Sequence, residues 1–265
     1  MRRAVVGAIL IGACVAACGG GGAGDARGRV ADYVHRANAI ERQYGSQFKA
    51  ANTAYVAFAK GKLASRAAVV RLTAAQRAIV EARGRLAGIQ PPSEAAMLRA
   101  RLLRYLDMNA AFARQTTWLA RYQRRSPAVL GPLNAANARL RARLQNATTA
   151  EQAAAMGDFA AALHRALRGM GALTVPAILR PAHDAQVRRL DRTRSLALRL
   201  RSALLAQDAQ NVARLLLRFR SNAASTTPRA ESVRAIDAYN RRFHKLTRAY
   251  ADVRREQVRL DRSLG

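Results

Sequence analysis

The chain has 265 residues, of which 46 are Lys or Arg and 16 are Asp or Glu, giving a formal net charge of +30. Half of the residues are apolar, which excludes a typical disordered chain, and 17 Gly with 7 Pro are too few for a collagen-like or low-complexity protein. The length allows one or two domains with a sizeable core. Only four of the basic residues are Lys, and this bias towards Arg limits how far charge alone indicates a function.

The N-terminus has the pattern of an export signal. Arg2 and Arg3 precede an uncharged and mostly apolar run over residues 4–17. This run is shorter than the roughly 18 residues that a helix needs to cross a bilayer. The pattern therefore predicts a cleavable signal over residues 1–17 rather than a permanent transmembrane helix.

The end of this run carries the most specific motif in the chain. Val15-Ala16-Ala17-Cys18 is followed directly by four glycines, and it resembles the lipobox of bacterial lipoproteins. The resemblance implies that the signal is cut before Cys18 and that the sulfur of Cys18 is diacylated. It also implies a protein anchored by lipid at the cell membrane, on the extracytoplasmic side. The segment 11–14, which ends at Cys14, fits the same pattern, but Cys18 follows a longer apolar run and directly precedes the glycines.

The residues after Cys18 predict a tether and then one domain. Residues 18–28 hold the lipidated Cys and a Gly-rich segment, a composition typical of a flexible linker. Cleavage before Cys18 would remove Cys14 and leave no free thiol for a disulfide, a Cys metal site or Cys catalysis. We expect residues 29–265 to form a single helical domain.

The rest of the chain has helical periodicity throughout. Apolar residues recur from Val30 to Phe58 at steps of three or four residues and would form a stripe on one face of a helix. No segment shows the strict alternation of apolar and polar residues that is typical of a strand. Pairs such as Ser126-Pro127 and Gly131-Pro132 predict a connector, because proline disfavours a continuing helix. A shorter helix would follow this connector and end near Leu144. The other expected helices cover residues 29–60, 63–88, 93–123, 149–171, 181–206, 208–220 and 229–263.

A weak internal repeat has a spacing of 84 residues, and each copy has the pattern helix, proline turn, helix. Together with long helices and short turns, this predicts an all-α fold: an antiparallel bundle of about six to eight helices with two related helical hairpins. In the first copy the matching residues are Leu86, Ile89, Pro92, Leu103, Leu106 and Asp107. In the second copy they are Met170, Leu173, Pro176, Val187, Leu190 and Asp191.

We find no catalytic or metal-binding pattern, and we therefore expect neither an enzyme nor a cofactor or metal site. The four His residues form no His-Glu-x-x-His motif, and Asp32-x-x-His35 is the only acid-x-x-His pair. There is no Gly-x-Ser-x-Gly motif and no recognisable pair of carboxyl groups. The one Trp, Trp118, lies close in sequence to Tyr105, Phe112 and Tyr122, which makes this segment a candidate for lining a ligand pocket.

The predicted function is non-catalytic binding or scaffolding at the cell envelope. Removal of Arg2 and Arg3 leaves 44 basic and 16 acidic residues, a net charge of +28. Besides the membrane that holds the anchor, the expected partners are anionic lipids or acidic wall polymers. An export signal argues against a nucleic-acid partner. The alternative is a ligand- or substrate-binding lipoprotein with a pocket between helices. Dense basic runs lie over residues 188–201 and 241–259.

Overall fold

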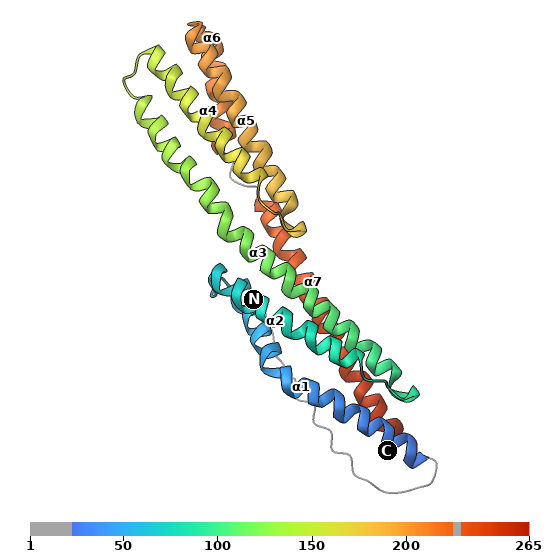
Figure 1. Cartoon of the computed structure of the whole chain (residues 1–265). Helices are drawn as coiled ribbons and strands as arrows, with labels where there is room; N and C mark the ends of the chain where they lie inside the picture. Colours follow the sequence, from blue (N-terminus) through green and yellow to red (C-terminus); the bar gives the residue numbers. More distant parts are fainter. Residues whose placement is uncertain (1–22, 225–228, 265) are drawn as a thin grey trace. The chain divides into compact units, whose positions relative to one another are not determined.

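The computed structural model describes residues 23–224 and 229–264, and the described chain is helical with no strand (Figure 1). The predicted all-α class is therefore confirmed, with seven α-helices and two short 3₁₀ turns in the described ranges. The elements are α1 (Ala23–Ala59), α2 (Ser65–Ala87), η1 (Ser93–Ala95), α3 (Ala96–Arg143), α4 (Thr149–Gly171), η2 (Ala177–Leu179), α5 (Arg180–Leu205), α6 (Ala209–Ala224) and α7 (Arg229–Leu264).

The helices form two compact units. Among the described residues, unit 1 comprises 23–120 and 240–264, and unit 2 comprises 121–224 and 229–239. In unit 1, α1 packs against α2, and in unit 2, α5 packs against both α4 and α6, as Figure 1 shows. The range 29–265, which we expected to be a single helical domain, thus contains two packed clusters of helices.

The core of unit 1 is built on the stripe that the sequence predicted for the first helix. Tyr33 and Tyr55 of α1 are almost fully buried. The ring of Tyr55 meets Phe112 of α3 edge to face at 4.7 Å between centroids, and Phe112 lies 5.8 Å from Phe243 of α7. These ring contacts join three helices that are distant in sequence.

The first helix begins earlier than expected. Helix α1 starts at Ala23, whereas we expected a flexible segment up to Gly28 and a helix from Arg29. A glycine inside a helix costs only about 1 kcal/mol relative to alanine, so Gly28 does not prevent the helix from extending. Residues 23–28 of the predicted tether are therefore helical, and residues 18–22 lie outside the described residues.

The prediction of a connector between Ser126 and Pro132 is wrong. Helix α3 continues from Ala96 to Arg143 with Pro127 and Pro132 inside it. Both prolines are exposed, and so are Gln123 and Ala128, whose carbonyls lose their intrahelical donors and can accept bonds from water.

Packing favours this continuous helix. Val129, Leu130 and Leu133 of α3 pack against the core of unit 2. A Cβ at Gly169 of α4 would lie only 2.7 Å from Cγ1 of Val129, so the two helices approach closely there.

The ends of the helices follow local chemistry. Helix α4 begins with a capping box, in which the Thr148 side chain accepts a bond from the Glu151 backbone N–H and the Glu151 carboxylate accepts one from the Thr148 N–H. The sequence Thr73-Ala-Ala-Gln76 has the same spacing as a capping box, but α2 runs through it, and the residue before α2 is Ala64, which has no capping side chain.

The repeat at a spacing of 84 residues is reproduced in the helix bounds. Helices α2 and α4 both have 23 residues, and their starts, the two 3₁₀ turns, and the starts of α3 and α5 are each offset by 84. Each turn is closed by the same bond, from Ala95 to the Pro92 carbonyl (3.0 Å) and from Leu179 to the Pro176 carbonyl (2.9 Å). The two hairpins therefore have the same register.

Burial repeats with the same spacing, including one polar position. Buried pairs offset by 84 are Leu72/Met156, Ala75/Phe159, Ile79/Leu163, Ala82/Ala166, Leu86/Met170, Leu106/Leu190, Asn109/Thr193 and Ala113/Ala197. Asn109 accepts a bond from Tyr55 Oη (3.0 Å), and Thr193 Oγ1 accepts one from Asn222 Nδ2 (2.7 Å). In each unit this buried polar position thus links the second helix of the hairpin to another helix.

One carboxylate is buried in unit 1. Glu256 of α7 is 2% exposed, and its Oε1 accepts a bond from Arg259 Nε (2.9 Å), while Arg101 of α3 lies 3.4 Å from Oε2. The hydrogen bond from Arg259 lowers the pKa of Glu256. A buried carboxylate is stable only with such partners, so this cluster helps to hold α7 on α3.

Within residues 23–224 and 229–264, none of the helices combines the length and the apolar character that crossing a membrane requires.

The capping box gives a stability prediction. Thr148→Ala removes the side-chain acceptor at the start of α4, so we expect the free energy of unfolding in urea to fall by about 1 kcal/mol. Thr149→Ala is the matched control, because Thr149 is the exposed first residue of the helix and caps nothing. Equal losses from the two substitutions would show that the capping box does not stabilise α4.

Candidate functional site

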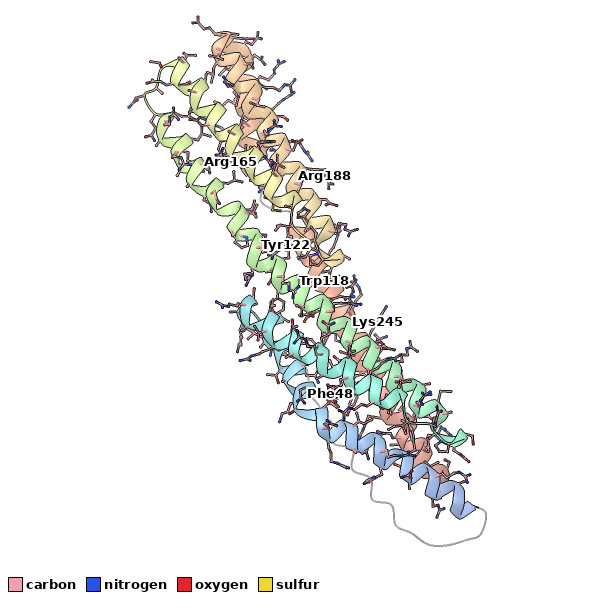
Figure 2. The ribbon with its side chains drawn as sticks, in the orientation of Figure 1. Phe48, Trp118, Tyr122, Arg165, Arg188 and Lys245 are labelled. Carbon is pink, nitrogen blue, oxygen red and sulfur yellow. The ribbon has the colours of Figure 1, made fainter. Side chains whose placement is uncertain are left out.

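The predicted lipidation site, Cys18, lies outside the described residues, as do the signal over residues 1–17 and the alternative Cys14. The aromatic segment around Trp118 does not form a pocket of its own. Trp118 is 43% exposed on α3, whereas Tyr105 and Phe112 are buried in the core of unit 1. Tyr122, further along α3 (Figure 2), belongs to unit 2 and lies 3.0 Å from Nδ1 of His183.

The histidines do not gather with acids. His35 is exposed, and its predicted neighbour Asp32 forms an ion pair with Arg36 at 2.7 Å instead. In the described part of the chain, no group of three or more His, Cys, Asp or Glu side chains could hold a metal ion.

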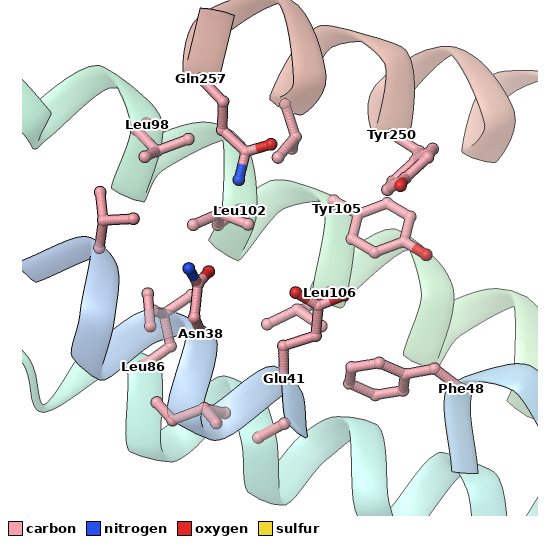
Figure 3. A pocket seen from close by; sticks show the side chains of 15 residues that line it. Asn38, Glu41, Phe48, Leu86, Leu98, Leu102, Tyr105, Leu106, Tyr250 and Gln257 are labelled. Carbon is pink, nitrogen blue, oxygen red and sulfur yellow. The ribbon is translucent and has the colours of Figure 1, made fainter. Parts of the chain in front are cut away.

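Unit 1 contains a small apolar cavity between α1, α2, α3 and α7 (Figure 3). Its volume is about 60 Å³, whereas an apolar cavity that accepts benzene has roughly 150 Å³. Tyr105 is the only residue of the predicted aromatic segment that lines it. The cavity therefore has room for a few water molecules and not for an organic ligand.

Glu41 is the one carboxyl group at this cavity. It projects from α1 towards α3, among Leu106, Tyr105 and Phe48 (Figure 3). Burial raises the pKa of Glu41 to about 7, and the charges of Arg254 and Arg42 only partly oppose this effect. Near neutral pH the carboxyl group thus holds a proton that it would lose in water.

A larger cavity lies in unit 2, between the antiparallel helices α5 and α6. The turn between them places Gln207 in the left-handed region at φ 53°, and Asp208 N–H donates to the Ala203 carbonyl at 3.0 Å. Asp208 then caps α6, because its Oδ1 accepts a bond from the Asn211 N–H at 3.0 Å. This tight turn fixes the two helices side by side.

We call the cavity between α5 and α6 the basic groove, and its volume is about 460 Å³. This volume lies within the range of about 300–1,000 Å³ that is usual for ligand sites. It is lined by Leu198, Arg199, Ser202, Ala203, Ala206, Asp208, Asn211, Arg214, Leu215 and Arg218.

The guanidinium groups of the basic groove are not neutralised. Arg199, Arg214 and Arg218 are all exposed, and among the described residues none of them forms an ion pair. Arg214 donates to the Asn211 side chain at 2.9 Å, while the single acid of the groove, Asp208, caps α6. Three positive charges therefore line a groove that contains no paired carboxylate.

The groove lies at the end of a longer basic face. Arg188 (labelled in Figure 2), Arg192 and Arg199 follow one another at steps of four and seven residues, so they lie on one face of α5. All three are exposed. Thus part of the dense basic run over residues 188–201 forms a stripe on one face of α5.

A second basic cavity of about 290 Å³ lies between α3 and α4. It is lined by Arg139, Arg143 and Arg165, but Asp158 also lines it and forms an ion pair with Arg143 at 2.5 Å. Three arginines and one acid line each of these two cavities, but in the α3–α4 cavity the acid is paired with one of the arginines.

Sequence reasoning missed Arg214 and Arg218 as site residues. Their spacing of four residues on a strongly amphipathic segment was a signal, but nothing in the sequence shows that they face Arg199 across a turn. Comparisons with protein-family models, with curated proteins and with solved structures found no match for this chain.

Glu41 gives a prediction of pH dependence. Well below pH 4.5 both the folded and the unfolded chain hold the proton, and well above pH 7 both have lost it. Between these values the folded chain binds more protons, so this group makes stability fall as the pH rises. We expect Glu41→Gln to stabilise the protein at pH 8 by about 2 kcal/mol and to have little effect at pH 4.5.

The measurement is urea unfolding at both pH values, with Glu81→Gln as the control. Glu81 is an exposed acid on α2 that pairs with Arg85 at 3.1 Å. Because the neighbouring Tyr44 hydroxyl and Arg85 lower the pKa of Glu81, this control should not stabilise the protein at pH 8. A Glu41→Gln effect that is the same at both pH values would contradict the assignment.

Proposed function

We propose that this chain is a lipid-anchored, extracytoplasmic helical protein that binds an anionic surface of the cell envelope without catalysing a reaction. The observation that carries the proposal is the basic groove, with three exposed guanidinium groups and no paired carboxylate. The lipobox-like segment ending at Cys18 supports the anchor. An anchored chain would keep its basic faces close to lipid headgroups or wall polymers, where attraction is strongest.

The charge distribution supports a surface rather than a single ion as the partner. Residues 121–239 hold 20 Arg and 7 acidic residues, and the rest of the described chain is also strongly basic. Charge of one sign over many helices attracts an extended anionic surface, and each basic residue near such a surface contributes about 1 kcal/mol.

The alternative is a lipoprotein that captures a soluble ligand between its helices. The volume of the basic groove, about 460 Å³, makes the groove a better candidate for the ligand site than the aromatic segment around Trp118. Because the groove is basic, such a ligand would be an anion rather than an apolar molecule.

The anchor is tested by metabolic labelling with an alkyne fatty acid. We expect wild type and Cys14→Ser to incorporate the label and to fractionate with membranes. Cys18→Ser should lose the label, because no other mature residue is a thiol. If Cys18→Ser keeps the label and Cys14→Ser loses it, the anchor is at Cys14. If both variants keep the label, the lipoprotein proposal is wrong.

The surface interaction is tested with vesicles and the full chain. We expect stronger partition into phosphatidylcholine vesicles that contain phosphatidylglycerol than into pure phosphatidylcholine, and this preference should fade between about 0.1 M and about 1 M salt. Pure phosphatidylcholine vesicles measure any contribution of the apolar N-terminus, which salt does not weaken. A preference that is absent at low salt rules out electrostatic binding to lipid.

A further inference from the structure

The basic groove is flanked by exposed leucines. Leu198 lines the groove and is 36% exposed, and Leu205 follows it by two helical turns, so both lie on one face of α5. On α6, Leu217 is 70% exposed and lies one turn from Arg214. Large apolar side chains at such exposure are costly in water unless another apolar phase covers them.

Cations beside exposed apolar groups are typical of helices that lie in a membrane interface. There the apolar side chains enter the boundary between headgroups and acyl chains, while Arg and Lys meet the phosphates. In the basic groove, Arg199 of α5 and both Arg214 and Arg218 of α6 border the same cavity, which Ser202, Asn211 and Asp208 also line. Guanidinium groups form paired hydrogen bonds with phosphate oxygens, which suits them to a phosphate ester.

The geometry points to the basic groove as the site where the phosphate of an anionic membrane lipid binds, with Leu198, Leu205 and Leu217 inserted at the lipid interface. This inference rests on the proposed function, because it names the part of the chain that contacts the anionic surface. The α5–α6 turn, capped by Asp208, would hold the three guanidinium groups in place before the lipid arrives.

Neither of the other two cavities described above has this combination. The α3–α4 cavity has an ion-paired carboxylate, and the apolar cavity of unit 1 has no arginine in its lining. The groove assignment therefore makes a prediction that total charge does not make. Removing three arginines from the groove should weaken binding to anionic vesicles more than removing three arginines elsewhere.

The experiment compares two triple variants of the full chain with equal loss of charge. The first is Arg199→Gln, Arg214→Gln, Arg218→Gln. The matched control is Arg121→Gln, Arg124→Gln, Arg125→Gln, which removes three exposed arginines from α3 in the same unit. The readout is the partition coefficient for vesicles with phosphatidylglycerol divided by that for pure phosphatidylcholine, after circular dichroism has established equal helix content.

We expect the groove variant to lose about a hundred-fold of this ratio, since each guanidinium group contributes roughly five-fold near an anionic surface. The control should lose no more than a few-fold. Equal losses would overturn the groove assignment while leaving the proposed function intact. If wild type itself has a ratio of one, the proposed function fails along with the inference.

Two further arms identify the source of the phosphate. Leu205→Ser with Leu217→Ser should weaken vesicle binding several-fold, and calorimetry with glycerol 3-phosphate should detect no saturable binding to wild type. Saturable binding of glycerol 3-phosphate that Arg199→Gln abolishes would assign the groove to a soluble ligand and overturn the lipid assignment. If sedimentation shows a dimer and Leu217→Ser converts it to a monomer, the leucines contact a second copy of the chain. This outcome would also overturn the lipid assignment.

Discussion

The scarcity of carboxylates constrains the whole structure. With 46 basic residues and 16 acids, most arginines have no partner of opposite charge, and an unpaired charge is too costly to bury. Each helix must therefore keep one face for the core and give the others to its arginines. The acids that are present have specific tasks: Glu256 is buried between two arginines, Glu151 completes the cap of α4, and Asp208 caps α6. Little negative charge remains to neutralise the outer face of the α5–α6 hairpin.

The two units solve the packing problem in the same way. Each has a hairpin around a proline turn whose first helix has 23 residues, and the two hairpins share buried positions that include one polar pair, Asn109 and Thr193. Their cavities differ in chemistry. Unit 1 encloses a small apolar cavity with Glu41, whereas unit 2 has an open groove with three arginines. Similar frameworks thus carry different surfaces, as expected when burial fixes the core and leaves outward-facing residues free to vary.

Periodicity and capping residues predicted most of the fold. The all-α class, the C-terminal ends of α1, α2 and α4, and the apolar stripe of α1 all followed from local patterns in the sequence. The connector at Pro127 failed because exposed prolines can be accommodated where the neighbouring side chains pack well, and the contact between Val129 and Gly169 is a long-range one. The groove could not be predicted, because the meeting of Arg199 with Arg214 and Arg218 depends on a turn built around the left-handed Gln207.

The continuity of α3 has a consequence for how this architecture can be divided. The boundaries between the units, at Ala120–Arg121 and at Tyr239–Asn240, both fall inside helices rather than in loops. A cut at either point would create two new helix ends, each with backbone groups that lack intrahelical partners. Neither unit can therefore be excised, swapped or transplanted as a module by joining at a linker. Insertions are tolerated best at exposed turns, and the turns that the structure describes lie within the units and not between them.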